Sequence, residues 1–428
     1  MKTIEIPAIP RVEGEGGLHL QVRDGKPIAV RLDIYEPPRF FEGFLLNRFI
    51  QEVPDLTARI CGICPVAYQM SSALALEDAL GIEVGPQTHA LRRLMYCGEY
   101  VESHALHIFM LQAPDLYGKE SIFELAAVEP DLARKALRLK KIGNQILTAI
   151  GGRSVHPVNV CVGGFYRWPD QAELNKLLPE LQWGLETAIA CVKWASSLPY
   201  PNLEMDYEFV ALHHASEYGV MSGEIWSSRG PKLAVCDFEN GYIEEHVQHS
   251  NALHGRTSTG GTYLVGPLAR LSLNSQQLRP LARQALADAE LPMPLQNPYK
   301  SLIARAIELV EFFDEAIALI TSYAPQGPPH TRLVLRAGEG TGATEAPRGL
   351  LYHRYRIDEN GLVQFAKITP PTAQNLPRIE ADLLALAPEL VALETPEASR
   401  RAEDLVRAYD PCISCATHFL RLTTEQID

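Results

Sequence analysis

Two stretches of the chain alternate apolar and polar residues with a period of two. The first covers residues 3–35, around the turn signal Asp24-Gly25. The second covers residues 350–368, with a polar, glycine-containing turn at 358–361. Alternation interrupted by such a turn is typical of β-hairpins. The sequence therefore predicts one hairpin at the N-terminus and another near 350–368.

Much of the remaining chain has the 3.6-residue period of helices. Pro65 opens one of them and Gly81 closes it, because proline suits a first helical turn and glycine a helix end. The predicted helices cover residues 65–80, 87–112, 129–150, 170–197, 298–324 and 376–408, with a shorter one within 40–53. Most exceed the usual mean of about 11–12 residues, so we expect a bundle of long helices at the core.

These elements predict an α+β fold that is mostly α, with a central bundle of long helices and β-hairpin appendages. The Pro- and Gly-rich segment 325–349 is the longest stretch predicted to be irregular. No internal repeat or low-complexity linker divides the sequence. We therefore expect residues 1–428 to form a single domain.

The composition narrows the classes of partner. The chain has 428 residues, 39 Lys and Arg against 52 Asp and Glu, and a net charge of −13. Such a surface repels phosphate backbones and anionic lipids, so no nucleic-acid partner is expected. No apolar run is long enough for a membrane span, and the first residues lack a signal-peptide core. Together with few cysteines, these features predict a cytoplasmic protein.

Four of the eight cysteines form two C-x-x-C pairs, Cys61 with Cys64 and Cys412 with Cys415, at opposite ends of the chain. A local zinc ribbon would place its second pair about 15–20 residues after the first. If the four thiolates meet, the whole fold has to bring them together, and such soft ligands suit zinc, nickel or iron. The alternative is two unrelated pairs. We interpret the remaining cysteines as small buried hydrophobic residues.

Seven motifs in chain order carry a family resemblance. They are Arg11-Val12-Glu13-Gly14, Phe41-Glu42-Gly43, Arg59-Ile60-Cys61-Gly62-Ile63-Cys64-Pro65, Glu102-Ser103-His104-Ala105-Leu106-His107, Gly152-Arg153-Ser154-Val155-His156-Pro157, Glu345-Ala346-Pro347-Arg348-Gly349 and Asp410-Pro411-Cys412-Ile413-Ser414-Cys415-Ala416-Thr417-His418. Over essentially its whole length the chain resembles the large, catalytic subunit of nickel–iron hydrogenases. It looks most like the cytoplasmic, NAD(P)-linked group, which includes the sulfhydrogenase α subunits.

The resemblance implies a nickel–iron centre with CO and cyanide on the iron. Cys61, Cys64, Cys412 and Cys415 would bind nickel, and Cys64 and Cys415 would also bridge to iron. Polarising a molecule as weakly acidic as H2 requires a Lewis-acidic metal and a nearby base. The resemblance assigns that base to the thiolate of Cys412.

The resemblance also assigns roles to four charged residues. Glu13 would relay protons beside Cys412, since burial can raise the pKa of a carboxyl toward a useful value. Arg348, predicted to lie in an irregular loop, would extend over the open side of the metal pair beside Asp115 and Asp410. An arginine is nearly always charged, so we expect an electrostatic or orienting role for Arg348 rather than that of a base.

A structural magnesium site near the C-terminus, or an iron at the same place, would use Glu42 and His418 with water and a backbone carbonyl. His104 and His107, three residues apart on one helix, could mimic a metal pair, but we interpret them as interior histidines. Tyr68 stands where family members commonly carry histidine. Its hydroxyl could donate a hydrogen bond toward a bridging sulfur.

Residues 419–428 resemble the C-terminal extension that a maturation endopeptidase removes after the histidine, here His418, in proteins loaded by nickel-insertion factors. With four cysteines committed, no cluster motif remains, and no G-x-G-x-x-G opens a helix. Iron–sulfur clusters, flavin and NAD(P) would therefore sit in partners, namely an iron–sulfur small subunit and flavin/NAD(P) diaphorase subunits.

The sequence thus predicts the catalytic subunit of a soluble hydrogenase, an oxidoreductase that cleaves H2 reversibly to protons and electrons. A hydrogen-sensing regulatory subunit of the same fold would keep all four cysteines and differ in its low turnover. The related quinone-site subunits of respiratory complexes lack the cysteine pairs. A zinc-stabilised structural protein would contain zinc and no nickel.

Overall fold

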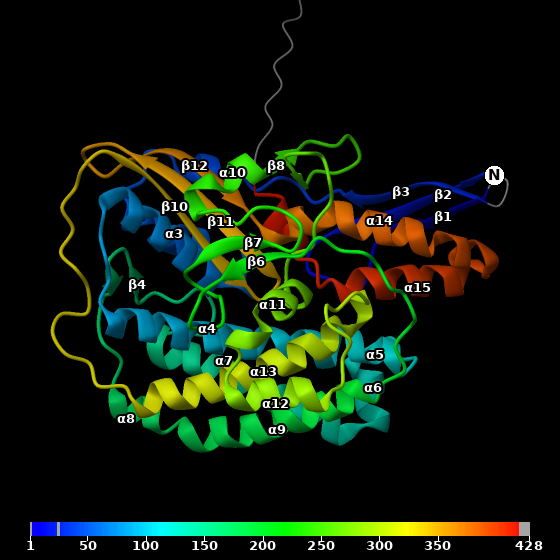
Figure 1. The fold of residues 1–428 in the computed structure, drawn as a ribbon, viewed down its shortest axis with the longest axis horizontal. Helices are drawn as coiled ribbons and strands as arrows, with labels where there is room; N and C mark the ends of the chain where they lie inside the picture. Colours follow the sequence, from blue (N-terminus) through cyan, green and yellow to red (C-terminus); the bar gives the residue numbers. More distant parts are fainter. Residues whose placement is uncertain (1, 24–25, 419–428) are drawn as a thin grey trace, which may run out of the picture.

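The core of the fold is a bundle of long helices that lie side by side (Figure 1). The computed structural model describes residues 2–23 and 26–418. The bundle helices are α4 (Pro86–Leu106), α7 (Pro130–Gly151), α9 (Leu178–Ser196), α12 (Pro280–Asp288) and α13 (Ser301–Thr321). Helix α13 contacts α4, α9 and α12 and is buried on almost all sides. A helix that is mostly apolar all round belongs in the interior of a bundle, which explains this position.

A three-stranded antiparallel sheet packs against helix α3 (Pro65–Leu80). Its strands are β10 (Gly338–Ala346), β11 (Gly349–Ile357) and β12 (Val363–Thr369). The contact with α3 is close, because a Cβ atom on Gly342 would lie 2.4 Å from the carbonyl oxygen of Ser71. This sheet corrects two expectations. The segment near 350–368 belongs to a sheet of three strands, and residues 338–346 are its first strand rather than irregular chain.

The N-terminal strands form a second three-stranded sheet, in the order β1 (Lys2–Ile6), β2 (Gly16–Arg23) and β3 (Lys26–Ile34). Leu18, Leu20 and Val22 alternate toward the core, as the pattern predicts. Helix α14 (Pro371–Ala392) packs against β3, and α15 (Thr395–Ala408) packs against α14 and β1 (Figure 1). The expected turn at Asp24-Gly25 lies outside the described residues.

Helix boundaries follow the local signals. Helix α3 ends at Gly81, whose φ of 64° favours glycine. The expected helix 87–112 continues beyond α4 as a π-helix (His107–Gln112) and α5 (Ala113–Leu116). The expected helix 170–197 is divided into α8 (Gln171–Asn175) and α9. The helical region 376–408 consists of α14 and α15.

Short elements complete the fold. The helices are α1 (Phe41–Leu45), α2 (Val53–Ala58), α6 (Ile122–Val128), α10 (Phe238–Gly241), α11 (Pro267–Asn274) and α16 (Ile413–Ala416). The strands pair as β4 (Val160–Cys161) with β5 (Gly164–Phe165), β6 (Val210–His213) with β7 (Glu224–Ser227), and β8 (Tyr242–Glu245) with β9 (His254–Thr257). The 3₁₀ turns are Val235–Asp237, Ser275–Gln277 and Pro298–Lys300. The predicted α+β class, mostly α, is confirmed.

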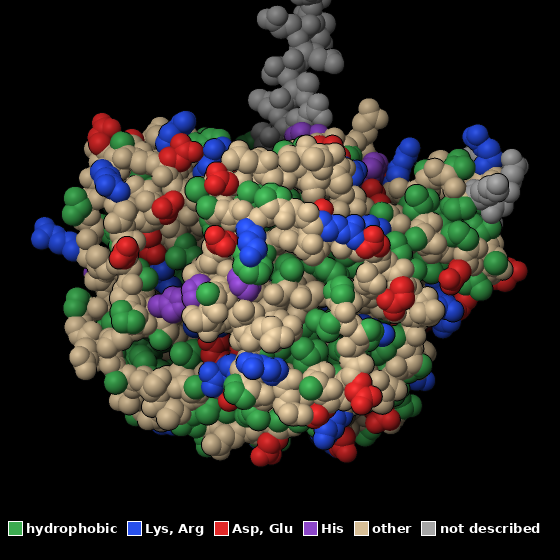
Figure 2. All heavy atoms as spheres, in the orientation of Figure 1, with side chains coloured by type: hydrophobic (Ala, Val, Ile, Leu, Met, Phe, Trp, Pro, Cys, Tyr) green, Lys and Arg blue, Asp and Glu red, His purple; other side chains and the backbone are tan. Residues whose placement is uncertain are grey.

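Two surface properties bear on partners. Within residues 2–23 and 26–418, no helix combines the length and apolar character needed to cross a bilayer. Acidic and basic side chains are interspersed over the face shown in Figure 2 rather than gathered into one basic patch. That face therefore offers no concentrated positive field for a phosphate backbone.

Candidate metal centre

The first cysteine pair lies in the turn that opens helix α3. Cys64 is the N-cap residue and Pro65 the first helical residue. The backbone N–H groups of Ile63 and Cys64 donate to Cys61 Sγ at 3.3 and 3.2 Å. The carboxylate of Glu99 on α4 accepts from the next N–H groups, those of Val66 at 2.6 Å and Ala67 at 3.1 Å. Backbone donors and the helix start thus fix this pair locally.

The second pair flanks the start of the four-residue helix α16, with Cys412 as its N-cap residue. The N–H of Cys412 donates to Thr372 Oγ1 at the start of α14, at 2.9 Å. The N–H of Ile413 donates to the backbone carbonyl of Glu13 at 2.9 Å. Contacts from other parts of the chain therefore position this pair.

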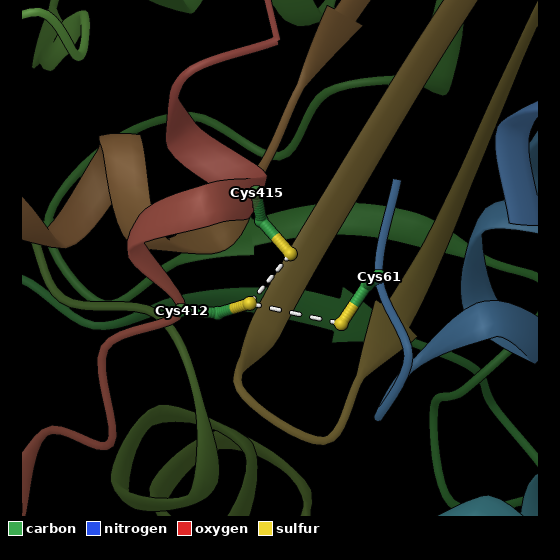
Figure 3. Close-up of side chains that lie close together, drawn as sticks. All are labelled: Cys61, Cys412 and Cys415. Atoms are coloured by element: carbon green, nitrogen blue, oxygen red, sulfur yellow. Dashed lines mark hydrogen bonds between the residues drawn. The ribbon is translucent and has the colours of Figure 1, made fainter. Parts of the chain in front are cut away.

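The fold brings the four sulfurs of the two pairs together (Figure 3 shows three of them). The Sγ–Sγ distance is 3.6 Å from Cys61 to Cys412, 2.7 Å from Cys412 to Cys415 and 4.0 Å from Cys64 to Cys415. Each of the four side chains is 1–2% exposed. The cluster selects a shared site over the alternative of two unrelated pairs.

Arg39 joins the loops that carry the two pairs. Its guanidinium donates to the carbonyl of Ile60 at 2.6 Å and also to the carbonyl of Ser414. Its backbone N–H donates to the carbonyl of Thr417 at 2.6 Å. One side chain therefore sets the distance between two loops that are far apart in the sequence.

Glu13 lies beside the second pair, as expected. The thiol of Cys412 donates to Glu13 Oε2 at 3.0 Å, and the N–H of Ser414 donates to the same oxygen at 3.1 Å. Gly14, with a φ of 89°, allows this approach, because a Cβ atom there would lie 2.7 Å from the Cβ of Ile413. The carboxylate is therefore within direct proton-transfer reach of a sulfur.

Arg348 lies in the tight turn between β10 and β11 rather than in the irregular loop predicted for it. Its Nε donates to the backbone carbonyl of Asp410 at 2.8 Å, and a terminal nitrogen donates to Asp410 Oδ1 at 2.9 Å. Burial opposes the charge, but Asp410 and the cysteine sulfurs raise the pKa of Arg348 well above its ordinary value. Nη1 is buried with no partner among the described residues. The guanidinium is thus a fixed positive charge with a free donor.

The expected position of Asp115 beside Arg348 is corrected. The guanidinium of Arg407 donates to both oxygens of Asp115, at 2.7 and 2.9 Å, and Arg11 also pairs with this carboxylate. These groups line a surface cavity of about 760 Å³. Among the described residues, Asp115 therefore pairs with Arg407 and Arg11, whereas Asp410 is the carboxylate that contacts Arg348.

Glu42 and His418 meet at a second cluster near the C-terminus. His418 Nε2 lies 3.5 Å from Glu42 Oε1 and 2.6 Å from the carbonyl oxygen of Ile368. The N–H of Ile368 donates to Glu42 Oε1 at 2.8 Å. A carboxylate, an imidazole and a backbone carbonyl thus converge. Such a set, completed by water, suits a hard divalent cation.

His104 and His107 point to different partners. His104 Nε2 lies 2.7 Å from Glu308 Oε2, and His107 Nε2 lies 2.8 Å from the carbonyl oxygen of Arg407. Burial lowers the pKa of His104 to about 4 and that of His107 to about 3, so both are neutral at pH 7. This agrees with their interpretation as interior histidines.

The donor set fits a nickel–iron centre. Four buried sulfurs are the soft ligands that nickel and iron take in proteins. Burial and the neighbouring sulfurs raise the pKa of the Cys412 thiol well above its ordinary value, so a cation binding there displaces protons. The unpartnered Nη1 of Arg348 adds a donor for a further polar group.

Comparison with known proteins decides the family. A family model described as Nickel-dependent hydrogenase matches residues 39–131 and 258–418. The chain is 34% identical to Sulfhydrogenase 2 subunit alpha of Pyrococcus furiosus over 98% of this chain and 100% of that protein. The chain belongs to the nickel-dependent hydrogenase family. The expected resemblance is confirmed, and membership makes the protein an oxidoreductase that acts on hydrogen.

Two further relatives resemble this hydrogenase subunit along its length. The NAD-reducing hydrogenase HoxS subunit beta of Cupriavidus necator is 28% identical, over 98% of this chain and 95% of that protein. The crystal structure of an NAD⁺-reducing [NiFe]-hydrogenase in the H2-reduced state aligns with a TM-score of 0.88 and 27% identity, over 98% of this chain and 100% of the other.

Several residues of the centre were not found from the sequence. Arg270 donates to the carbonyls of Ala346 and Pro347, each at 2.9 Å, and so fixes the turn before Arg348. Thr372 acts through one long-range hydrogen bond, and Arg39 and Glu99 each act through several. No local pattern marks such residues, because each is an ordinary polar residue until the fold places it.

Proposed function

We propose that this subunit catalyses the reversible cleavage of H2 to protons and electrons at a nickel–iron centre. Electrons would leave through an iron–sulfur small subunit toward flavin and NAD(P) in diaphorase subunits. The observation that carries the proposal is a buried cluster of four cysteine sulfurs with the Glu13 carboxylate 3.0 Å from Cys412 Sγ. The cytoplasmic location stays a prediction.

The resident metals, once bound, supply the Lewis acid that polarises H2. In this proposal Cys61, Cys64, Cys412 and Cys415 would hold nickel, and Cys64 and Cys415 would also hold an iron with CO and cyanide ligands. The thiolate of Cys412 accepts the proton. Its contact with Glu13 makes it better suited to this role than Cys61, whose sulfur accepts from backbone N–H groups.

Glu13 passes the proton outward. Its Oε2 accepts from both Cys412 and the N–H of Ser414, so the carboxylate is oriented before any proton arrives. A positioned acid or base of this kind contributes roughly 10²–10⁴-fold to a rate. Glu13 itself is half-buried, which allows a path toward solvent.

Arg348 acts as a charged positioning group. Asp410 fixes the guanidinium through its side chain and its carbonyl, while Arg305 lies 3.7 Å from Asp410 Oδ2 on the other side. Preorganised donors in a buried site stabilise developing negative charge without reorganisation. Asp115 has no part in this proposal, because its arginine partners are elsewhere.

We further propose that Glu42, His418 and the carbonyl of Ile368 bind magnesium, or iron, as a structural cation. The side chain of His418 is fully buried, and its Nδ1 lies 2.8 Å from the carbonyl oxygen of Cys415. A cation there would fix the chain just beyond the second cysteine pair. Residues 419–428, the proposed substrate of a maturation endopeptidase, lie outside the described residues.

An apolar surface beside the first cysteine pair is the proposed docking face of the small subunit. This surface contains five apolar side chains that are each more than a third exposed, namely Phe44, Leu46, Phe49, Val158 and Tyr166. The first three precede α2 in the chain, and the other two lie on either side of β4, which contacts α2. Two hydrogen bonds join the segment around α2 to residues 156–166: one between Gln51 and Val162, the other between His156 and Ala58. Helix α2 leads directly to Cys61, and exposed apolar groups of this kind mark interfaces.

Elemental analysis of the purified complex, with an infrared spectrum of the same sample, tests the proposal. We expect nickel and iron near one each per chain, bands from CO and cyanide, and H2-dependent reduction of NAD(P)⁺. The Cys412→Ser variant should lose nickel and activity together. Zinc without nickel, and no such bands, from a chain processed after His418 would contradict the proposal.

A further inference from the structure

A third cluster of side chains that can bind a metal lies outside the groups assigned above. It consists of His249, His254 and Glu380, and one ligand atom from each lies within 4.8 Å of the other two. His249 is in the loop between β8 and β9, His254 is the first residue of β9, and Glu380 is on α14. The segment leading into β9 thus contributes two imidazoles, and α14 contributes one carboxylate.

His254 is the most informative member of this cluster. Its side chain is 1% exposed, and neither ring nitrogen has a hydrogen-bond partner among the described residues. Its Nδ1 lies 3.9 Å from Glu380 Oε2. A buried imidazole without hydrogen-bond partners is costly because its desolvation is not compensated, so its position calls for an explanation. A cation beside Nδ1 would satisfy it.

Glu380 is already oriented for such a role. Its Oε1 accepts from the N–H of Leu32 in β3 at 2.9 Å and lies 2.7 Å from His249 Nε2. Carboxylates that bind metals are usually oriented by a hydrogen bond from a neighbouring group, and the N–H of Leu32 provides such a bond here. Arg256, the nearest guanidinium on β9, is paired with Glu245 at 2.5 Å. The carboxylate is therefore available.

We propose that His249, His254 and Glu380 form a divalent cation site, with zinc as the preferred metal. Two imidazoles and one carboxylate are a common zinc set that leaves one position for water. Ligand atoms on one zinc ion lie at most about 4.4 Å apart, given bonds of about 2.0–2.2 Å. Small rotations of the three side chains would bring their ligand atoms, now within 4.8 Å of one another, to the separation that zinc requires.

The site links the N-terminal sheet to the helix that positions Cys412. Helix α14 contacts both β3 and β9, and its first turn supplies Thr372 to the N–H of Cys412. A cation bound by Glu380 and the two histidines would fix the β8–β9 loop and the middle of α14 against each other. Its effect would be on stability and on metal content rather than on the chemical step.

The test uses the purified complex with nickel loaded, so that the four cysteines are occupied. The sample is incubated with zinc, freed of excess zinc by gel filtration with a weak chelator, and assayed for zinc per chain. Zinc K-edge X-ray absorption reports the ligand atoms. Variants are His249→Gln and Glu380→Gln, with His19→Gln as the control. His19 is also a histidine near a carboxylate, 3.3 Å from Glu5.

We expect the wild type and His19→Gln to retain one zinc that has nitrogen and oxygen neighbours. His249→Gln and Glu380→Gln should each bind it more weakly by more than the roughly 10–100-fold that loss of an outer-shell partner costs. Zinc retained equally in all four proteins, zinc with sulfur neighbours, or no zinc retained by the wild type would each overturn the proposal. Hydrogenase activity is not a readout, so these results are independent of the proposed function.

Discussion

The two cysteine pairs approach the same point in the molecule, but different contacts position them. The pair at Cys61 and Cys64 sits at the start of a helix, and backbone N–H groups and Glu99 fix it. The pair at Cys412 and Cys415 sits on a helix of four residues that is too short to be stable alone. Side chains and backbone from far along the chain hold it.

This difference separates a preorganised half of the centre from an assembled half. The first half depends mainly on its own turn and on α3 and α4, which are close to it in the sequence, with one further contact from Arg39. The second half needs Glu13, Arg39, Thr372 and Arg348, so most of the fold has to be in place. We therefore expect substitutions around the second pair to impair catalysis and those around the first pair to affect mainly stability.

Glu13→Gln should give the largest loss. Glutamine keeps an oxygen for Ser414 but cannot carry a proton away from Cys412. We expect H2 oxidation to fall by roughly 10²–10⁴-fold while nickel and iron contents stay at wild-type levels. The control is Glu15→Gln, an exposed glutamate two residues away. Activity near that of the wild type in Glu13→Gln would remove Glu13 from the proton path.

Arg348→Lys should give a smaller loss. Lysine keeps the charge but cannot donate along two directions to the carbonyl and carboxylate of Asp410. We expect kcat to fall by about 10–100-fold, less than the roughly 10²–10³-fold for a fully removed donor. Arg354→Lys on the next strand, where the arginine pairs with Glu239, is the matched control. Equal rates in both variants would contradict the orienting role.

The sequence predicts the first half of the centre better than the second. Pro65 and Gly81 give the bounds of α3 correctly, because both act through local backbone geometry. Strand β10 was missed because Gly338, Gly340 and Gly342 are typical of loops. Here they allow the strand to lie against α3, so packing decides the conformation.

The contacts of the second pair follow from tertiary structure alone. The family resemblance placed Glu13 beside Cys412 and Asp410 beside Arg348, and the structure has both contacts. It placed Asp115 wrongly, because Arg407 and Arg11, in other segments, engage that carboxylate. Thr372 could not be predicted, because its role depends on a single contact with a backbone N–H far along the chain.

Glu99→Gln tests the first half through stability. Burial raises the pKa of Glu99 well above its usual value, although the N–H groups of Val66 and Ala67 oppose this shift. A raised pKa means that the contribution of Glu99 to stability is greatest below about pH 4.3 and falls as pH rises toward the folded-state pKa. Glutamine has no charge to bury, so that fall should be absent in the variant.

Urea unfolding at several pH values measures this effect. At low pH we expect Glu99→Gln to be less stable by about 0.5–1.5 kcal/mol, the contribution of a typical hydrogen bond. The difference should shrink or reverse as the pH rises. Glu83→Gln, at an exposed position, should follow the wild type at every pH. A difference that grows with pH would mean that Glu99 is stabilised as a carboxylate.

Tyr68→Phe should have the smallest effect and sharpens the comparison most. The Tyr68 hydroxyl is buried with no partner among the described residues, and its ring lies 5.8 Å from the ring of His353. Burial and the charges of Cys415 and Cys64 raise the pKa of Tyr68 well above its ordinary value, so the hydroxyl stays a donor. Removing an unpaired hydroxyl should change the free energy of unfolding by less than about 1 kcal/mol.

If the hydroxyl donates to a sulfur of the assembled centre, the infrared bands of CO and cyanide should shift in Tyr68→Phe. Tyr68→His, which restores a donor, should move them back toward the wild type. Identical bands in all three proteins would show that residue 68 donates no hydrogen bond to the centre.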